Sequence, residues 1–392
     1  MSLSVRAPAY TVAQAFPTYV PGHEADVHWE LLRRSLCRSV LLTEELVDNG
    51  VSPHPQTYWL VRAPVRPGPL DWVRRGQRRL AARSRQTRLE SFIGGKLAEH
   101  AADILHIHFG TFAVKLLPLL DRVRLPVVVT LYGVDASAAL REPATLAAYR
   151  RLYPRVGRMI VLSEIVRERL EATGCSPDRI TVWDMPLDFR PYPYHEPRPG
   201  PTVKLLTAAR FVEKKGYPTL LRAVALLKGR GLPVSLTAIG YGPLKDSIRD
   251  MARQLGLEAH VTIVDTSAHR GFSSLYSCAL AAHDIFVLPS TVARNGDDEG
   301  GPALTLVMAQ AAGLPVVCTR FTGSERSVID GETGLFCRPD DPEALAERLS
   351  FLISRPHLWR SLGEAGSRFV RERFNKDRQI DALAAIYGSL LR

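Results

Sequence analysis

The feature that most constrains the fold is an alternation of short apolar runs with helical stretches along the whole chain. Strands that alternate with helical segments of about 10–15 residues indicate βαβ units and parallel sheets. The runs are almost entirely apolar, as expected of strands covered on both faces. They occupy residues 39–45, 56–64, 104–110, 126–133 and 158–164 in the first half, and 203–210, 234–240, 261–265, 284–290, 315–320 and 333–339 in the second.

The chain length predicts two such domains. It has 392 residues, and one hydrophobic core rarely grows beyond about 250–300 residues. The proline-rich stretch 192–201 is the best candidate for a linker. We therefore expect an α/β fold with a Rossmann-like N-terminal domain over 1–195, a second over 196–372, and a C-terminal helix over 373–392 that returns to the first domain.

Helix signals are clearest in the second half. Apolar residues share one face of 216–231, which ends at a glycine. Asp341 is placed to cap a helix that continues to residue 353, with proline at its first position. Residues 378–391 have the pattern of one more amphipathic helix.

Composition excludes some classes of protein and leaves others open. The five cysteines are scattered without a CxxC pair, which indicates reduced thiols in a cytosolic protein and no zinc site. The N-terminus lacks a signal-peptide pattern, and no apolar run approaches about 18 residues, so we expect no transmembrane helix. A net charge of +11 suits nucleic acid, anionic lipid or a phosphorylated substrate.

Much of the positive charge lies in one segment. Residues 62–88 carry nine arginines against one acid, Asp71, with Trp72, Val73 and Leu80 interspersed. A basic amphipathic segment can lie on an anionic membrane, but a solvated helix or a basic rim that attracts an anionic acceptor explains the pattern too. Nucleic acid is disfavoured because no aromatic stacking platform or nucleic-acid module accompanies the run.

Two loops at predicted strand ends carry groups suited to an anion. In open α/β sheets, ligands bind beyond the carboxyl ends of the strands. Arg210, Lys214 and Lys215 follow one strand and precede Gly216, and arginine and lysine both bind phosphate. Gly240 and Gly242 bracket Tyr241 after the next strand. A basic solvated turn and a tight strand-to-helix turn are the alternatives.

The stretch NGDDEGGPALTLVMAQAAGLPVV, 295–317, offers a third site. Its prolyl residue Pro302 suits the first turn of a helix that runs to about Ala312. A helix start presents free amide groups and about half a positive charge, so it can bind a phosphate. Glu299 stands just before it and can accept hydrogen bonds from sugar hydroxyls, or it can simply interact with the helix dipole.

These motifs together resemble the retaining glycosyltransferases of family 4, near the exopolysaccharide enzymes of colanic acid and amylovoran synthesis. The resemblance implies the GT-B fold, in which two Rossmann-like domains face each other across a cleft. The second half matches almost end to end, and the first half matches more loosely. The matching segments are AARFVEKKGYPTLLRAVALL, IGYGPL, FVLPS, EGGPALTLVMAQAAGLPVV and DGETGLFCRPDDPEALAERL, with LHIHFGTFA, VVVTLYGVDAS and MIVLSEIVRERLEATG before them.

The resemblance implies roles for residues on the donor side. Arg210 and Lys215 correspond to the residues that hold the donor diphosphate, and Glu299 to the first glutamate of a paired motif, which holds the sugar. These three are the expected catalytic residues. The expected donor-binding set adds Gly240, Tyr241, Gly300, Gly301, Pro302, Ala303, Leu304, Thr305 and Met308.

The chain departs from the family at the second glutamate of this motif, which contacts ribose. Val307 stands eight positions after Glu299, and Met308 is the equivalent if one residue has been inserted near Pro302. Neither side chain accepts a hydrogen bond with any strength. Ribose recognition is therefore altered, weakened, or taken over by another side chain such as Gln310.

The acceptor side is expected in the N-terminal domain. Tyr132 replaces a family histidine that lies near the reacting sugar, and tyrosine is a poor base at neutral pH. Gly22 stands in for a reduced glycine-rich loop. His106 and His108 share one strand face, and we expect no metal because no third ligand accompanies them. The expected acceptor-side residues are Gly22, His108, Tyr132, Asp135 and Ser163.

The sequence thus predicts a metal-independent, retaining hexosyltransferase without a cofactor. A nucleotide sugar is expected as the donor, and a hydroxyl of a glycan, lipid-linked or small-molecule glycoside precursor as the acceptor. The expected location is the cytoplasm, where residues 62–88 can contact the inner face of a membrane. The oligomeric state is open. The alternatives are another GT-B enzyme, such as a phosphorylase or an epimerase, and a non-catalytic protein that binds a sugar nucleotide.

Overall fold

The computed structural model describes the chain except for residues 1–9, 21–36, 49–51, 65–70 and 268–271, and gives the backbone alone for 48, 63–64 and 71–83. It divides into two compact units, each with its own sheet. Unit 1 comprises 1–161, 167–186 and 376–392, and unit 2 comprises 162–166 and 187–375.

The division differs in position from the predicted boundary at 195. The chain already belongs to unit 2 from residue 187, because Leu187 N donates to Phe374 O and His195 N to Ala312 O. Tyr192 is buried there, and Arg371 donates to its carbonyl at 2.6 Å. The proline-rich stretch 192–201 therefore already belongs to unit 2, and the change from unit 1 to unit 2 comes before it, at residue 187.

Unit 1 is built on a seven-stranded parallel sheet in the order β3-β2-β1-β4-β5-β6-β7. The central strands β4 and β5 are buried at every residue. This explains the apolar run of β5, whereas β4 also buries two histidines, His106 and His108. The strands are β1 Thr11–Tyr19, β2 Arg38–Asp48, β3 Thr57–Pro64, β4 Ile104–His108, β5 Val127–Thr130, β6 Arg158–Val161 and β7 Ile180–Val182.

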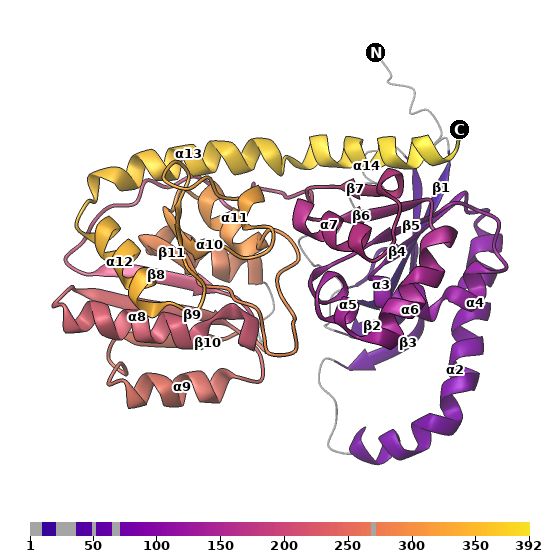
Figure 1. Ribbon diagram of the computed structural model, residues 1–392, viewed down its shortest axis with the longest axis horizontal. Coiled ribbons are helices and arrows are strands. Elements are labelled where there is room, and N and C mark those ends of the chain that lie inside the picture. Colours follow the sequence, from indigo (N-terminus) through magenta and orange to yellow (C-terminus); the bar gives the residue numbers. More distant parts are fainter. Residues whose placement is uncertain (1–9, 21–36, 49–51, 65–70, 268–271) are drawn as a thin grey trace. The chain divides into compact units, whose positions relative to one another are not determined.

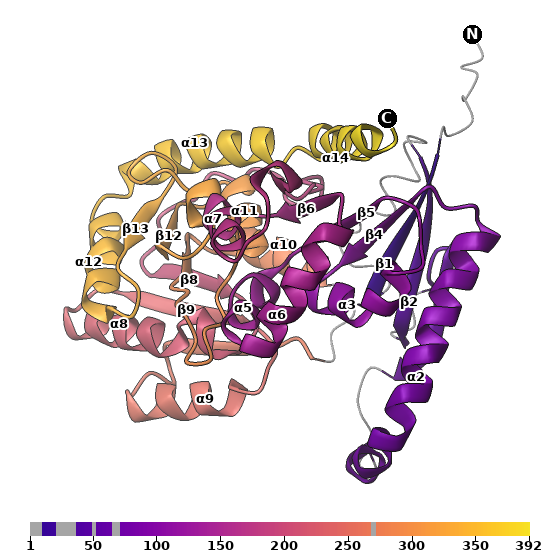
Figure 2. The same cartoon turned by 45° about the vertical axis from the view of Figure 1, so that its right-hand side comes forward.

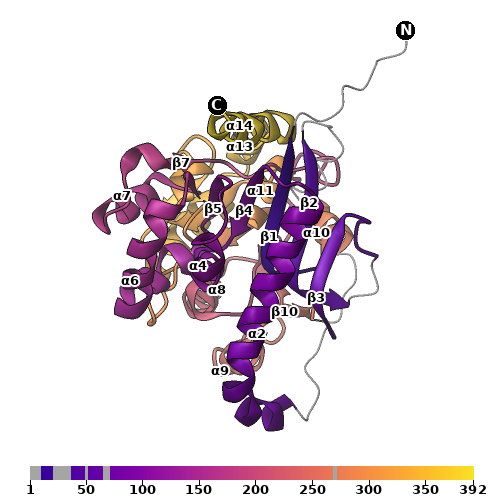
Figure 3. The same ribbon diagram turned by 90° about the vertical axis from the view of Figure 1, so that its right-hand side faces the viewer.

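Helices accompany this sheet, and the longest, α2, runs alongside β2 (Figures 2 and 3). The helices are α2 Asp71–Glu99, α3 Gly110–Lys115, α4 Leu117–Leu120, α5 Ala138–Arg141, α6 Pro143–Leu152, α7 Glu164–Ala172 and α14 Lys376–Leu390, of which α7 begins within unit 2. Three 3-10 turns, η1 Gly133–Ala136, η2 Tyr153–Arg155 and η3 Pro177–Arg179, join them.

The C-terminal helix α14 belongs to unit 1. The indole of Trp183 donates to Gln379 O at 3.1 Å, and the hydroxyl of Tyr10 donates to Ala384 O at 3.4 Å. Tyr387 is fully buried among side chains of the sheet. The end of the chain is thus fixed onto the unit that its beginning forms. Among the described residues, no helix has the length and apolarity that a membrane span needs.

Unit 2 has a six-stranded parallel sheet in the order β10-β9-β8-β11-β12-β13. Figure 1 labels β10, β9, β8 and β11, and Figure 2 labels β12 and β13. Successive residues of a strand face opposite sides. Leu205 and Val287 thus pack into one core cluster, and Leu206 and Phe286 into the other. The strands are β8 Val203–Ala208, β9 Val234–Gly240, β10 Val261–Asp265, β11 Ile285–Leu288, β12 Val316–Thr319 and β13 Leu335–Cys337.

Helices cover both faces of this sheet. Leu220 of α8 and Leu345 of α12 pack into the first cluster, whereas Tyr276 of α10 and Leu306 of α11 pack into the second. Asp341 caps α12 as predicted, accepting from Ala344 N at 2.9 Å. The helices are α8 Tyr217–Gly229, α9 Lys245–Gln254, α10 Phe272–Ala282, α11 Leu304–Ala311, α12 Pro342–Ile353 and α13 His357–Arg373, with the 3-10 turns η4 Glu213–Lys215 and η5 Ser324–Arg326.

The strand order places a topological switch point in each sheet. In unit 1 the chain leaves β1 toward β2 and later resumes on its other side with β4; in unit 2 it does the same at β8 and β11. Connections diverge at such points, and ligands of open α/β sheets bind beyond the strand ends there. Both switch points carry polar residues that the sequence singled out.

Gly216 tests the packing at the switch point of unit 2. Its φ is 65°, and a Cβ there would lie 1.8 Å from Pro289 O, in the loop after β11. We expect Gly216→Ala to lower the free energy of unfolding by at least about 2 kcal/mol, because a left-handed conformation and a backbone clash act together.

Gly256→Ala is the matched control. Gly256 has φ 63° with nothing within 4 Å of a Cβ, so strain alone should cost about 1 kcal/mol. Urea denaturation measures both variants. Equal losses of stability would show that the contact between the two loops contributes nothing.

Candidate functional site

Two loops of unit 2 meet at its switch point, and they hold most of the predicted donor-side residues. The first follows β8, includes η4 and ends at Gly216, and the second follows β11 and leads to α11. Thr291 N donates to Lys214 O at 2.8 Å, which joins the loops through the backbone. Residues about 84 positions apart in sequence are thereby brought together.

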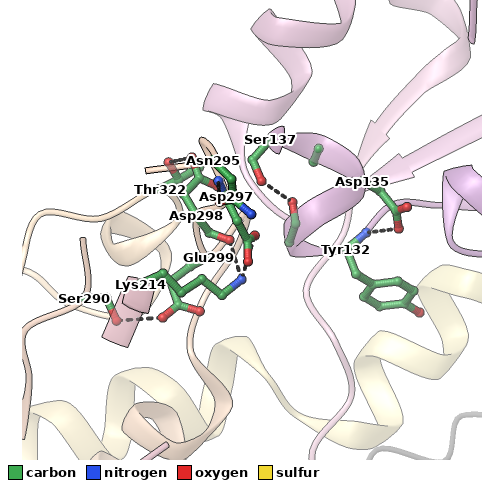
Figure 4. A network of polar contacts seen from close by, with 12 residues as sticks. Tyr132, Asp135, Ser137, Lys214, Ser290, Asn295, Asp297, Asp298, Glu299 and Thr322 are labelled. Atoms are coloured by element: carbon green, nitrogen blue, oxygen red, sulfur yellow. Dashed lines mark hydrogen bonds and ion pairs between the residues drawn. The ribbon is translucent and has the colours of Figure 1, made fainter. Parts of the chain in front are cut away.

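The predicted pair Lys215 and Glu299 forms a direct ion pair. The ammonium of Lys215 lies 2.6 Å from Oε1 and 2.8 Å from Oε2 of Glu299. Ser290, at the end of β11, donates to the same carboxylate at 2.6 Å (Figure 4). The side chains of Lys215 and Glu299 are 12% and 8% exposed, so this pair is largely withdrawn from water.

Lys214 forms a second tie to the same loop. Its ammonium donates to Asp297 Oδ1 at 2.9 Å and to the carbonyl of Asp298 at 2.7 Å (Figure 4). Thr322 donates to Asp298 Oδ2 at 2.9 Å from the other side. A buried cation needs such partners, because an unpaired charge in the interior is strongly destabilising. Lys214 thus fixes the loop that carries Glu299.

These neighbours set the ionisation of Glu299. Burial raises the pKa of its carboxyl. The charges of Lys215 and Lys214 and the hydrogen bonds from Lys215 and Ser290 lower the pKa by a larger amount, so it lies below its usual value. Glu299 is therefore a carboxylate at neutral pH. It can accept hydrogen bonds from hydroxyl groups, and it is a poor proton donor.

Arg210 differs from the two lysines. It is exposed just after β8, and its guanidinium makes no hydrogen bond or ion pair with any residue that the structure describes. A guanidinium offers five N–H donors in a planar fork that matches phosphate. Arg210 is thus the cation of this site whose donors are available for a ligand.

The start of α11 lies directly after this loop. Ala303 is the N-cap residue, no side chain caps the helix by a hydrogen bond, and the helix begins at Leu304. Pro302 therefore lies before the N-cap residue, whereas the sequence predicted it in the first turn of the helix. Leu304 and Thr305 are half-buried, and the first amides of a helix have no partner within it. The backbone before the cap turns at Gly300, where φ is 69°.

Two predicted donor-side glycines have a packing role. A Cβ on Gly240 would lie 2.0 Å from Ala209 O, and one on Gly301 would lie 2.5 Å from Leu162 Cβ. The close approach of neighbouring protein atoms thus requires glycine at both positions, with or without a bound ligand. Tyr241, beside Gly240, is 51% exposed and its carbonyl accepts from Phe211 N at 2.7 Å.

The positions of the expected second glutamate lie in the core. Val307 is fully buried and Met308 is 5% exposed, and both belong to the apolar cluster beneath α11. Gln310 is fully buried too and donates to Ser327 O at 2.6 Å. These three side chains are engaged in packing, so this structure gives no support for a ribose contact from Met308 or Gln310.

In unit 1, two predicted acceptor-side residues contact each other. His108 Nδ1 lies 2.8 Å from the hydroxyl of Tyr132, and burial raises the pKa of Tyr132 well above its usual value. Asp135 is fully buried and accepts from the backbone and hydroxyl of Thr111, at 3.1 and 2.8 Å, and from Tyr132 N at 3.5 Å. Figure 4 shows Asp135 directed toward the backbone of Tyr132. Asp135 therefore shapes the turn that carries Tyr132.

Of the remaining predicted residues, one lies in unit 2 and the others lie outside the residues that the structure describes. Ser163, expected on the acceptor side, belongs to unit 2, where it donates to Gly300 O at 3.3 Å. Gly22 lies outside the described residues. In the basic segment 62–88, the side chains of 63–83 lie outside them as well.

Sequence reasoning missed several residues of these sites. Ser290, Asp297 and Thr322 support Glu299 or its loop, and Gln14 and Tyr387 contact the two histidines of β4. The run of acids at 297–299 was a usable signal for the first group. No local pattern connects Gln14 with Tyr387, which are 373 positions apart.

The structure gives neither cysteines nor histidines a metal-binding arrangement in its described part. All five cysteines are free thiols. The described residues contain no group of three or more histidine, cysteine, aspartate or glutamate side chains that could hold a metal ion.

The pairing of Glu299 predicts a pH-dependent contribution to stability. The folded-state pKa of Glu299 lies below its unfolded value, so the pair contributes fully above the usual glutamate pKa and loses its contribution as pH falls through the folded-state value. We expect Glu299→Gln to reduce the free energy of unfolding by about 2 kcal/mol at pH 7, and the difference from wild type to shrink below pH 4.5.

Glu364→Gln is the control, because Glu364 pairs with Arg360 at an exposed surface. It should change stability by less than about 0.5 kcal/mol at either pH. Chemical denaturation across this pH range provides the comparison. A difference between wild type and Glu299→Gln that stays constant with pH would contradict the assigned ionisation.

Family models match both parts of the chain. The model described as glycosyl transferases group 1 matches residues 193–369, and the model described as glycosyltransferase family 4 matches residues 26–189. Together they include nearly all of the chain apart from its two ends.

Curated relatives agree with these matches. WcaL of Salmonella typhimurium, named for glycosyl transfer in colanic acid biosynthesis, is 30% identical over 254 residues, which are 64% of this chain and 61% of WcaL. The amylovoran biosynthesis glycosyltransferase AmsK of Erwinia amylovora is 28% identical over 291 residues, 72% of this chain and 68% of AmsK. The chain thus spans less than two thirds of the length of WcaL.

Solved structures share the fold. Sucrose-phosphate synthase from Thermosynechococcus elongatus superposes with a TM-score of 0.76 at 17% identity, covering 97% of this chain and 99% of that one. HepE of Anabaena, in complex with UDP and glucose, superposes with a TM-score of 0.75 at 16% identity, covering 97% and 100%. With two parallel α/β units and both family models matched, the chain belongs to the family 4 glycosyltransferases of the GT-B fold.

Proposed function

We propose that this chain is a retaining, metal-independent hexosyltransferase that moves a sugar from a nucleotide-diphosphate sugar to a hydroxyl group. The observation that carries the proposal is the arrangement at the switch point of unit 2. Arg210 is exposed in the loop after β8, and Lys215 of that loop pairs with Glu299 of the loop that leads to α11.

The arrangement suits a diphosphate and its sugar. Lys215 has three donors, and its ion pair with Glu299 does not exclude a further bond to a phosphate oxygen. Arg210 adds a planar fork, and the amides at the start of α11 add partial positive charge. Glu299, ionised at neutral pH, would accept from the hydroxyls of the donor sugar.

The proposed reaction breaks the bond from the anomeric carbon to the diphosphate oxygen and forms one to the acceptor oxygen on the same face. The acceptor proton would pass to an oxygen of the departing diphosphate, so no protein base is required. Negative charge on that diphosphate grows as its bond breaks, and fixed cations stabilise it more in the transition state than in the ground state.

The names of similar proteins support a choice of donor and acceptor to test. HepE is described with UDP and glucose, so UDP-sugars are the first donors to try. The names of WcaL and AmsK point to exopolysaccharide synthesis. We propose a glycan or lipid-linked acceptor met in the cytoplasm. Because Val307 and Met308 are buried, groups other than a second glutamate would hold the ribose.

A transfer assay tests the proposal. Thermal-shift screening across UDP-, GDP- and ADP-sugars first identifies the donor, since a ligand stabilises the state that binds it. With that donor, Arg210→Ala should lower kcat/KM by about 100-fold to 1,000-fold, the usual loss for one group that stabilises developing charge. Arg222→Ala, an exposed arginine on α8, should leave kcat/KM unchanged.

The other functions give different results. Turnover that depends on inorganic phosphate would favour a phosphorylase, and an altered sugar nucleotide without transfer would favour an epimerase. Donor binding without transfer or hydrolysis in wild type and in Glu299→Ala would sink the enzymatic proposal and leave a sugar-nucleotide-binding protein.

Membrane contact is a finer part of the proposal. Residues 62–88 carry nine arginines and one acid, and Trp59 and Val61 of the neighbouring strand β3 are each 39% exposed. Each basic residue near an anionic surface contributes about 1 kcal/mol. We expect co-sedimentation with phosphatidylserine-containing vesicles and its loss at high salt. Equal binding to phosphatidylcholine vesicles, or none to either, would contradict membrane contact by this segment.

A further inference from the structure

A closed set of buried polar side chains occupies the switch point of unit 1. It lies on one face of β1, β4 and β5, where Gln14 is paired in register with His106, and His108 with Thr130. Tyr387 of α14 covers it. We call the set the polar ring; its members are Gln14, His106, His108, Thr130, Tyr132 and Tyr387.

One half of the polar ring connects Tyr132 to the C-terminal helix. The hydroxyl of Tyr132 lies 2.8 Å from His108 Nδ1, and His108 Nε2 lies 2.8 Å from Gln14 Oε1. Gln14 Nε2 then donates to the hydroxyl of Tyr387 at 3.1 Å. His108 also stacks on Phe16, with ring centroids 3.9 Å apart and 7° between the planes.

The other half returns to Tyr132. The hydroxyl of Tyr387 lies 2.7 Å from His106 Nδ1, and His106 Nε2 lies 2.7 Å from Thr130 Oγ1. Thr130 in turn lies close enough to the hydroxyl of Tyr132 to lower its pKa, which brings the path back to Tyr132. Each polar side-chain atom of the polar ring thus has a hydrogen-bond partner, as buried polar groups require.

The amide of Gln14 fixes the direction of every bond. Its oxygen can only accept, so His108 carries its proton on Nε2 and accepts from Tyr132 on Nδ1. Its nitrogen can only donate, so the hydroxyl of Tyr387 accepts there. Because the proton of that buried hydroxyl then needs an acceptor, we assign it to the bond with His106 Nδ1. His106 then donates from Nε2 to Thr130. With the amide reversed, both histidines would carry their protons on Nδ1 instead.

The ionisation of the members agrees with a neutral set. Burial lowers the pKa of His106 to about 3, and burial raises the pKa of Tyr387 well above its usual value. Neither group carries charge near neutral pH, so the polar ring is held by hydrogen bonds between neutral partners.

We propose that Tyr387, on the C-terminal helix, is a positioning residue for Tyr132, acting through Gln14 and His108 in the Nε2–H tautomer. Since the proton of Tyr132 is donated to His108, any further hydrogen bond that its hydroxyl makes to a ligand is one that the oxygen accepts. Tyr132 would accept from the attacking hydroxyl of the acceptor and orient it. This role rests on the proposed function.

The tautomers can be observed directly. In the full chain labelled with ¹⁵N-histidine, the signals of His106 and His108, assigned with His106→Gln and His108→Gln, should show neutral Nε2–H rings from pH 5.5 to 8. The Nδ1–H form for both rings, or protonation of His108 in this range, would overturn the proposed direction of the bonds.

Kinetics test the positioning role. Tyr387→Phe removes the hydroxyl that serves both Gln14 and His106, so we expect a mixture of tautomers at His108. The kcat/KM for the acceptor should fall about tenfold, roughly the equivalent of one hydrogen bond, with the KM for the donor unchanged because the donor-side residues lie in unit 2.

Two further variants keep the test decisive. Tyr153→Phe removes another buried tyrosine hydroxyl of unit 1, bonded to Thr173 outside the polar ring, and should alter neither the histidine signals nor the acceptor KM. Thr130→Val opens the polar ring at the opposite side and should reproduce the effects of Tyr387→Phe if that variant does not fold. Equal behaviour of Tyr387→Phe and Tyr153→Phe would refute the role of Tyr387.

The experiment separates this inference from the proposed function. A wild-type chain that binds donors but transfers no sugar removes the acceptor role of Tyr132 together with the proposed function. The histidine signals are recorded without substrate, so they decide the structure of the polar ring in either case.

Discussion

Burial of Lys214 and Lys215 against the loop 297–299 is the interaction on which the candidate donor site depends. Two ammonium groups, each less than about one eighth exposed, are held by carboxylates and a carbonyl that come from a loop on the neighbouring strand. Charges withdrawn from water are stable only with such partners. The turn after β8 and the loop after β11 therefore hold each other in place, and the position of Glu299 relative to the turn after β8 is set before any ligand arrives.

The switch point of unit 1 meets the same constraint with neutral groups. Gln14, His106 and Tyr387 are completely buried, and each finds its partners among side chains of the same unit. A charged site can balance the growing charge of a diphosphate, whereas a neutral site of hydroxyl and imidazole groups can orient a hydroxyl without attracting a second anion. Under the proposed function, the charged site would serve the nucleotide-sugar donor and the neutral site the hydroxyl acceptor.

The sequence allowed the strands of unit 2 to be predicted well, because each is an apolar run bounded by turn residues; β9 and β10 match the predicted ranges residue for residue. It did not reveal β1, which mixes small and polar residues and contains Pro17. That proline is tolerated because β4 pairs only with residues 12–15 of β1, so the ladder on that side ends before it. The three-residue strand β7 is too short to show a pattern. The basic turn after β8 could be recognised from the local sequence. Its pairing with Glu299, and the link between Gln14 and Tyr387, depend on contacts that form only when the chain folds.

The absence of a second acid in 300–317 has a structural reason. The helix α11 is buried from Leu306 to Ala311 between the sheet and α13, so its side chains serve the core. A carboxylate at position 307 or 308 would have to be desolvated there, at a cost that only a specific partner could offset. Changing Met308 to glutamate would therefore not create a ribose contact by itself. Under the proposed function, a donor would instead be recognised through the backbone of 300–305, through Arg210 and Lys215, and through side chains elsewhere in unit 2. Its nucleotide preference would then be set by residues outside the paired-glutamate motif.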